Sequence, residues 1–213
     1  MHLFKWTIDY MFDRSIRRVK DQWLHPLVVL FGDTSPCVVS VTACVIGLAS
    51  AWLSWMRCYE WAISLWLLNR LFDGLDGAIA RKQDKQTDFG GYVDILLDFV
   101  VYAAVPLGVA FSTTNVIHHV ALGILLSVYY LNAASWMYLS ALLEKHQHGV
   151  FMTKEQTSIT MPVTLIGGTE TVVAYVLFLI LPSFFGWLAG LFSLLIVFGI
   201  LQRLNWARGH LNS

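Results

Sequence analysis

Four aspartates recur at helical spacing within a largely apolar stretch of the sequence: Asp73, Asp76, Asp94 and Asp98. Residues three or four positions apart share one face of a helix, so each of two helices would carry a pair of carboxylates. The linker KQDKQTDF lies between the pairs and lets the two helices run antiparallel with these faces opposed. The spacing therefore predicts a cluster of four carboxylates between neighbouring helices.

Such a cluster needs positive charge, because a carboxylate at the centre of a membrane helix costs about 2.5–3.5 kcal/mol. Hard divalent cations with oxygen ligands, such as Mg²⁺, are the natural complement. Two of these ions sharing carboxylates can bind a pyrophosphate and stabilise in-line displacement at phosphorus. Gly77 and Ala80 would leave room for a nucleotide against the backbone, and Gly90 would let the two helices approach closely.

The composition places these acids in a membrane protein. The 213 residues are 57% hydrophobic and 13% charged, whereas soluble domains are about 45–50% apolar and about 25% charged. The formal net charge is zero, so no nucleic-acid partner is expected. The three cysteines lack metal-ligand spacing and are interpreted as small apolar residues. The N-terminus lacks the pattern of a secretory signal.

The hydrophobic pattern predicts an all-α integral membrane protein with six transmembrane helices and an N-terminal amphipathic juxtamembrane helix. A helix needs about 20 mainly apolar residues to cross the hydrocarbon core. The predicted spans are 36–56, 60–80, 91–111, 116–142, 162–182 and 185–205. They form one membrane domain over residues 26–213, with no soluble domain.

Residues 1–25 are predicted to form an interfacial helix. Phe4, Ile8, Phe12 and Ile16 repeat every four residues, and a basic cluster at residues 14–20 suits anionic headgroups. The alternative is a helix that packs on a soluble partner.

The lysines and arginines predict the orientation. With the N-terminus in the cytoplasm, twelve of them lie in inside segments, Arg57 lies outside and Arg70 lies within a span. Cytoplasmic loops carry an excess of these residues, so both termini and the acidic ends of the second and third spans are expected to face the cytoplasm.

The pattern D-x2-D-G-x2-A-R-x8-G-x3-D-x3-D resembles the signature of the CDP-alcohol phosphotransferase (CDP-alcohol phosphatidyltransferase) family. Every signature position is filled, by Asp73, Asp76, Gly77, Ala80, Arg81, Gly90, Asp94 and Asp98. One departure lies outside the signature: Cys37 follows Pro36, where members of the family often carry Asn. Any nucleotide contact from that Asn is left open for this chain.

The resemblance implies an enzyme of phospholipid synthesis that transfers a phosphatidyl group from CDP-diacylglycerol to the hydroxyl of an alcohol and releases CMP. By analogy, two Mg²⁺ or Mn²⁺ ions are held, one by Asp73, Asp76 and Asp94 and the other by Asp73, Asp94 and Asp98. Asp98 also accepts the proton of the alcohol. Asp73, Gly77, Ala80, Arg81 and Gly90 form the donor pocket. The resemblance further implies a homodimer in the bilayer, which in a bacterium is the inner membrane.

Two other functions remain open. Within the family, CDP-choline or CDP-ethanolamine can be the donor and diacylglycerol the acceptor, and the signature does not separate the two arrangements. Outside the family, paired acids in a membrane can form an ion relay or transport pathway. The sequence leaves the acceptor undetermined among glycerol 3-phosphate, serine, inositol or its phosphate, and another lipid headgroup.

Two further charged residues have alternative interpretations. Glu170, predicted inside the fifth span, is a candidate wall of the acceptor pocket, or else a buried acid paired with Arg203. Arg70 stands three residues before Asp73 and either neutralises it or extends to the interface, and the first interpretation is favoured.

Four polar residues are assigned structural roles. Asp88 is interpreted as the N-cap of the third span, and Asp84 as a solvated linker charge. Asn132 and Ser135 are expected to form hydrogen bonds between helices.

Overall fold

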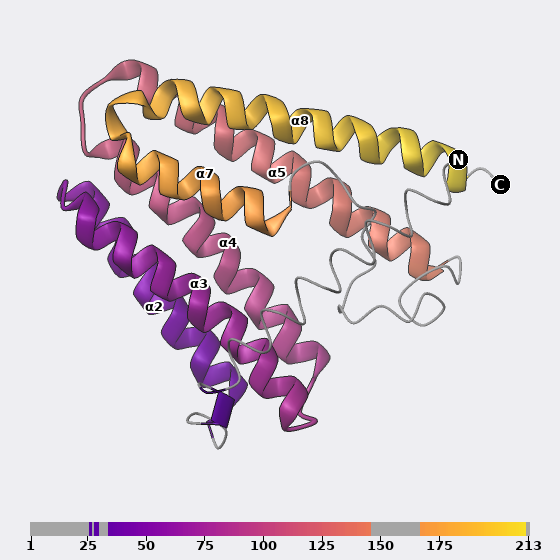
Figure 1. The fold of residues 1–213 in the computed structure, drawn as a ribbon. Helices are drawn as coiled ribbons and strands as arrows, with labels where there is room; N and C mark the ends of the chain where they lie inside the picture. Colours follow the sequence, from indigo (N-terminus) through magenta and orange to yellow (C-terminus); the bar gives the residue numbers. More distant parts are fainter. Residues whose placement is uncertain (1–25, 27, 30–33, 146–166, 212–213) are drawn as a thin grey trace. The chain divides into compact units, whose positions relative to one another are not determined.

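Helices account for the architecture in the computed structural model, which describes residues 26, 28–29, 34–145 and 167–211 (Figure 1). No strand occurs among these residues, so the all-α prediction is confirmed for them. The main elements are α2 (Pro36–Trp55), α3 (Tyr59–Lys82), α4 (Asp88–Phe111), α5 (Val116–Lys145), α7 (Gly168–Ile180), the short 3₁₀ helix η1 (Pro182–Phe184) and α8 (Phe185–His210). The interfacial helix predicted over residues 1–25 lies outside the described residues.

Among the residues that the structure describes, four stretches are long and apolar enough to cross a membrane: Pro36–Trp55, Asp88–Phe111, Val116–Lys145 and Pro182–His210. Helix α3 has 24 residues, but charged side chains such as Arg70, Asp73 and Asp76 lower its hydropathy. Helix α7 has 13 residues, about 20 Å of helix, which is shorter than the hydrocarbon core of about 30 Å. The described helices thus support a protein with several membrane-spanning helices, and the count of six remains a prediction.

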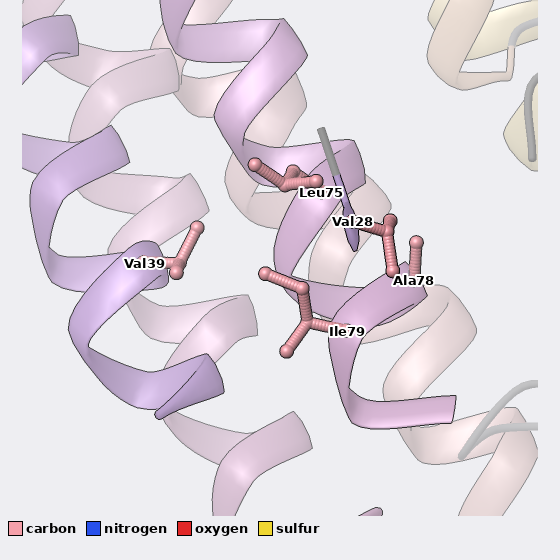
Figure 2. Close-up of a cluster of buried hydrophobic side chains, with 5 residues drawn as sticks. All are labelled: Val28, Val39, Leu75, Ala78 and Ile79. Carbon is pink, nitrogen blue, oxygen red and sulfur yellow. The ribbon is translucent and has the colours of Figure 1, made fainter. Parts of the chain in front are cut away.

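The first of two compact units contains Met1–Ile46 and Leu67–Phe99. It includes the beginning of α2, the second half of α3 and the first half of α4. Figure 2 shows its buried apolar cluster, formed by Val28, Val39, Leu75, Ala78 and Ile79. Leu75, Ala78 and Ile79 lie on one face of α3, and their packing against Val39 of α2 fixes the rotation of α3 about its axis.

The connection from α3 to α4 is formed by local hydrogen bonds. The Lys85 N–H donates to the Ala80 carbonyl at 3.0 Å, and Asp84 has a φ of 52°; this is the left-handed geometry that closes many helix C-termini. The Thr87 hydroxyl accepts the N–H of Gly90 at 3.0 Å and caps α4. The prediction that Asp88 is the N-cap was wrong by one residue, because the threonine hydroxyl supplies the cap.

The second unit contains Gly47–Trp66 and Val100–Ser213. In Figure 1, α8 runs beside α5, and α7 packs against α8. Trp66 and Tyr175 are fully buried and stack with their ring centroids 4.8 Å apart. The Tyr175 hydroxyl donates to the Tyr102 carbonyl, so this aromatic cluster joins α3, α4 and α7.

Within this second unit, helices α2 and α4 approach each other closely at Gly108. A Cβ atom at this position would lie 2.2 Å from the Ala51 carbonyl oxygen, a backbone atom that cannot move aside. We therefore expect Gly108→Ala to lower the free energy of unfolding by about 1–3 kcal/mol, as overpacking does, measured by thermal unfolding in detergent. Gly123→Ala in α5 is the matched control, since no described atom lies within 4 Å of its added Cβ. Equal effects of the two substitutions would contradict the steric explanation.

Candidate active site

The acidic residues of α3 lie on the helix beside its packed apolar face. Asp76 is buried, at 5% exposure, next to the buried Leu75 and Ile79. The Asp73 side chain is about a quarter exposed. Because the Leu75, Ala78 and Ile79 face is held by α2, the two carboxylates have a fixed direction relative to the rest of the first unit.

The four aspartates meet across α3 and α4 in two pairs. The carboxyl of Asp94 lies within hydrogen-bonding reach of Asp76, and the carboxyl of Asp98 lies within hydrogen-bonding reach of Asp73. Each pair joins one residue of α3 to one residue of α4. The predicted meeting of the two acidic faces is confirmed.

Arg70 lies against one of these pairs. Its Nη2 donates to Asp98 Oδ1 at 2.9 Å, and its Nη1 lies 3.6 Å from Asp73 Oδ2. The side chain is 10% exposed, so the guanidinium is directed into the acidic cluster and not toward an interface. The favoured interpretation of Arg70 as a counter-charge is confirmed, with Asp98 as a second partner.

Helix α2 contributes a hydroxyl to the other pair. Ser40, buried at 7% exposure, donates its Oγ hydrogen to Asp76 Oδ2 at 2.5 Å. A hydrogen bond to a carboxylate is stronger than one between neutral groups, and it fixes the direction of the acceptor. Ser40 therefore holds one Asp76 oxygen in a fixed direction.

The residues predicted to bind the donor lie in the same unit. Gly77 is half-buried, and an added Cβ there would lie 3.3 Å from Nη1 of Arg81, whose side chain is exposed. Ala80 is half-buried two residues before the end of α3. At Gly90, Thr87 Oγ1 is the described atom nearest to an added Cβ, at 3.0 Å. The close approach of helices expected at Gly90 is therefore not seen, and the space there is limited by the helix cap.

The ligand atoms of the site are of the kind that binds a divalent cation. Four carboxylates from two helices offer only oxygen ligands, which is the chemistry that Mg²⁺ and Mn²⁺ select. Among the described residues the acids form pairs, and no three of them surround one point. The residue types and their proximity fit such an ion. The four side chains are arranged as two neighbouring pairs of carboxylates.

Glu170 and Arg203 belong to the second unit, and neither is the partner of the other. Glu170 is exposed in the first turn of α7, where its Oε2 accepts the N–H of Gly167 at 2.9 Å. Arg203, at 6% exposure, donates through Nη1 to Asn132 Oδ1 and Ser135 Oγ, each at 3.1 Å. The suggested Glu170–Arg203 pair is therefore not formed, and Glu170 lies at a helix start instead of deep within a span. The expectation that Asn132 and Ser135 bond between helices is confirmed.

Sequence reasoning missed two residues that support the acids: Ser40 and Asn69. Asn69 is 1% exposed, and its Nδ2 donates to the Ala43 carbonyl at 2.7 Å. Polar side chains are rare in apolar helices, so a serine four residues after Pro36 and an asparagine next to Arg70 were available signals. Their spacing alone did not reveal which helix they face.

The amino-acid sequence matches a known family over most of its length. Residues 33–201 match the family described as CDP-alcohol phosphatidyltransferase. The chain is 38% identical over 187 residues to the inner membrane protein YnjF of Escherichia coli K12, covering 87% of this chain and 89% of that protein. The chain is also 33% identical over 111 residues to the bifunctional IPC transferase and DIPP synthase of Thermococcus kodakarensis. This shorter match covers 52% of this chain and 25% of that protein.

The fold is also similar to that of solved structures. Phosphatidylinositol phosphate synthase PgsA1 of Mycobacterium tuberculosis, crystallised with CDP-DAG, matches with a TM-score of 0.64 at 20% identity, covering 88% of this chain and 92% of that one. The same protein in complex with manganese and citrate matches with a TM-score of 0.62 at 20% identity, covering 87% and 85%. At this identity the similarity establishes the fold.

Proposed function

The chain belongs to the CDP-alcohol phosphatidyltransferase family, and from this premise we propose that it is a multi-pass membrane enzyme that transfers a phosphatidyl group from CDP-diacylglycerol to an alcohol. The observation that carries the proposal is the meeting of Asp76 with Asp94 and of Asp73 with Asp98 across α3 and α4. These four are the acids of the family signature. The binding of CDP-DAG by the Mycobacterium protein of similar fold supports CDP-diacylglycerol as the donor.

In the proposed reaction, the acceptor hydroxyl oxygen forms a bond to the phosphorus that carries the diacylglycerol. The bond from that phosphorus to the oxygen of the CMP phosphate breaks, and CMP leaves. Asp98 accepts the hydroxyl proton, and Asp73, Asp76, Asp94 and Asp98 would hold two divalent cations. These cations would neutralise the pyrophosphate and the charge that develops on the leaving group. The manganese complex of the Mycobacterium protein supports this choice of ion.

The remaining residues are assigned to binding. Gly77, Ala80 and Arg81 lie in the last six residues of α3, after the two acids. We assign them, with Gly90, to the CDP moiety. An exposed guanidinium such as that of Arg81 suits a phosphate oxygen. The excess of Lys and Arg in the inside segments supports a site that faces the cytoplasm, and the family supports a homodimer.

The proposal is tested by supplying the purified protein with CDP-diacylglycerol, Mn²⁺ or Mg²⁺, and a panel of alcohols. The panel contains glycerol 3-phosphate, serine, inositol and inositol 1-phosphate. We expect CMP release that requires one of these alcohols and a new lipid whose mass equals the phosphatidyl group joined to it. An Asp98→Asn preparation is the control for contaminating activity. Product formation from CDP-choline and diacylglycerol alone would instead support the reversed arrangement. An absence of CMP with every combination of donor and acceptor would contradict the proposed enzymatic function.

Acceptor choice is proposed to involve Glu170, whose carboxylate is exposed at the beginning of α7. Glu170→Gln keeps the size of the side chain and an oxygen that can accept the Gly167 N–H, so α7 should remain capped. If Glu170 contacts the acceptor, we expect an acceptor KM raised by about tenfold at an unchanged KM for CDP-diacylglycerol. Unchanged kinetics for both substrates would assign Glu170 to capping alone.

A further inference from the structure

Arg70 occupies a position that the catalytic scheme above does not use. Its guanidinium contacts Asp98 at 2.9 Å and lies 3.6 Å from Asp73, and these are the two acids assigned respectively to the proton transfer and to both cations. The side chain is 10% exposed, whereas the Asp73 and Asp98 side chains are 25% and 27% exposed. The Arg70 side chain is therefore more buried than the two carboxylates that it contacts.

Asn69 holds the guanidinium in this direction. The Asn69 Oδ1 accepts a hydrogen bond from Arg70 Nε at 2.7 Å, and the Asn69 Nδ2 donates to the Ala43 carbonyl of α2 at 2.7 Å. Asn69 is itself 1% exposed. A continuous series of hydrogen bonds thus runs from the α2 backbone through Asn69 and Arg70 to Asp98, and it fixes the fork of the guanidinium beside the acids.

A guanidinium and a divalent cation compete for the oxygen atoms of a carboxylate. Both bind its oxygen lone pairs, and Asp98 Oδ1 is already used by Arg70 Nη2. Their charges also repel each other, and this repulsion is strong at short range where solvent is limited. Arg70 therefore stabilises the acidic cluster by itself and opposes the binding of a cation to it.

We infer that Arg70 is a positioning residue that acts as the internal counter-ion of the acidic site: it holds Asp73 and Asp98 in place and sets the cation concentration that the site requires. The inference rests on the proposed function in taking a divalent cation as the ligand of these acids. The inference predicts that Arg70 stabilises the cation-free protein and weakens the binding of the cation. Removing its charge should destabilise the cation-free protein and should strengthen cation binding.

The test measures thermal unfolding in detergent, without substrate, as Mn²⁺ is titrated. Arg70→Gln removes the charge and keeps a polar side chain. We expect a lower melting temperature than wild type without Mn²⁺, a larger rise on its addition, and half-saturation at a Mn²⁺ concentration about tenfold lower. Arg70→Lys keeps the charge and loses the planar fork, so its half-saturation should lie between those of wild type and Arg70→Gln.

Arg57→Gln is the matched control. It removes a guanidinium whose Nε donates to the Ser112 carbonyl at 2.7 Å. Any change in its melting temperature comes from this lost contact alone, so its Mn²⁺ half-saturation should equal that of wild type. If Arg70 had only a structural role, Arg70→Gln would lower the melting temperature equally with and without Mn²⁺. The Mn²⁺ concentration at half-saturation would then be that of wild type.

Each outcome decides the inference. Wild-type half-saturation in Arg70→Gln overturns it and leaves the proposed function intact. The absence of a Mn²⁺ shift in wild type and in every variant overturns the cation part of the proposed function and this inference with it. Folding of Arg70→Gln only in the presence of Mn²⁺ supports the inference. If Arg70→Gln does not fold at any Mn²⁺ concentration, Arg70→Lys decides: half-saturation at the wild-type Mn²⁺ concentration overturns the inference, and half-saturation at a lower concentration supports it.

Discussion

Asp98→Asn is expected to lower the turnover of CDP-diacylglycerol by about 10²–10⁴-fold, the range for loss of a general base, while donor binding persists. The amide keeps the shape of the side chain but does not accept the proton of the acceptor hydroxyl. Asp73→Asn should lose both turnover and donor binding, since Asp73 is assigned to both cations. Turnover is measured as CMP release, and donor binding as the shift in melting temperature produced by CDP-diacylglycerol.

Two comparisons make this pair of substitutions decisive. Asp84→Asn is the control, because Asp84 is an exposed linker acid with a φ of 52° that asparagine also adopts. We expect it to retain activity. Both Asp98 and Asp73 contact Arg70, so loss of an Arg70 partner is common to the two variants and does not explain a difference between them. Equal and modest losses at Asp73 and Asp98 would show that the assignment of their roles is wrong.

Removal of divalent cations is expected to have the second large effect. Four carboxylates and the Arg70 guanidinium together leave an excess of negative charge, and a pyrophosphate brought to them would be repelled. Activity in excess EDTA should fall by at least about 10³-fold, and added Mg²⁺ or Mn²⁺ should restore it. CMP release is measured alongside far-ultraviolet circular dichroism, which distinguishes a loss of cation from a loss of helix.

The chelator experiment has a clear contrary result. Full CMP release with EDTA in excess, in protein freed of bound metal, would exclude cation-assisted transfer by these acids. Binding of CDP-diacylglycerol under the same conditions indicates which step needs the ion. Donor binding that persists while turnover is lost would place the requirement at the chemical step.

The amino-acid sequence by itself determined where the helices lie. Its predicted spans at 36–56, 60–80, 91–111 and 116–142 correspond to α2, α3, α4 and α5, whose observed ends differ by at most three residues. The length of an apolar segment predicts a membrane helix directly, because in lipid the backbone N–H and C=O groups of the segment must hydrogen-bond within the helix itself. The spacing of Asp73, Asp76, Asp94 and Asp98 is likewise a local property, and the helical period converts it into two acidic faces without further information.

Only the tertiary structure decided which of these groups meet. Asp76 faces Asp94 and Ser40, and Asp73 faces Asp98, because the packing of α3 on α2 sets the rotation of the helix. The roles of Asn69 and Arg70 depend on the Ala43 carbonyl, 26 residues away from Asn69 in the sequence. Glu170 was predicted inside a span and instead caps α7, since the local start of that helix, and not its apolar content, determines its partner. Helical periodicity defines a face, whereas contacts between residues distant in the chain depend on how the apolar side chains of separate helices pack.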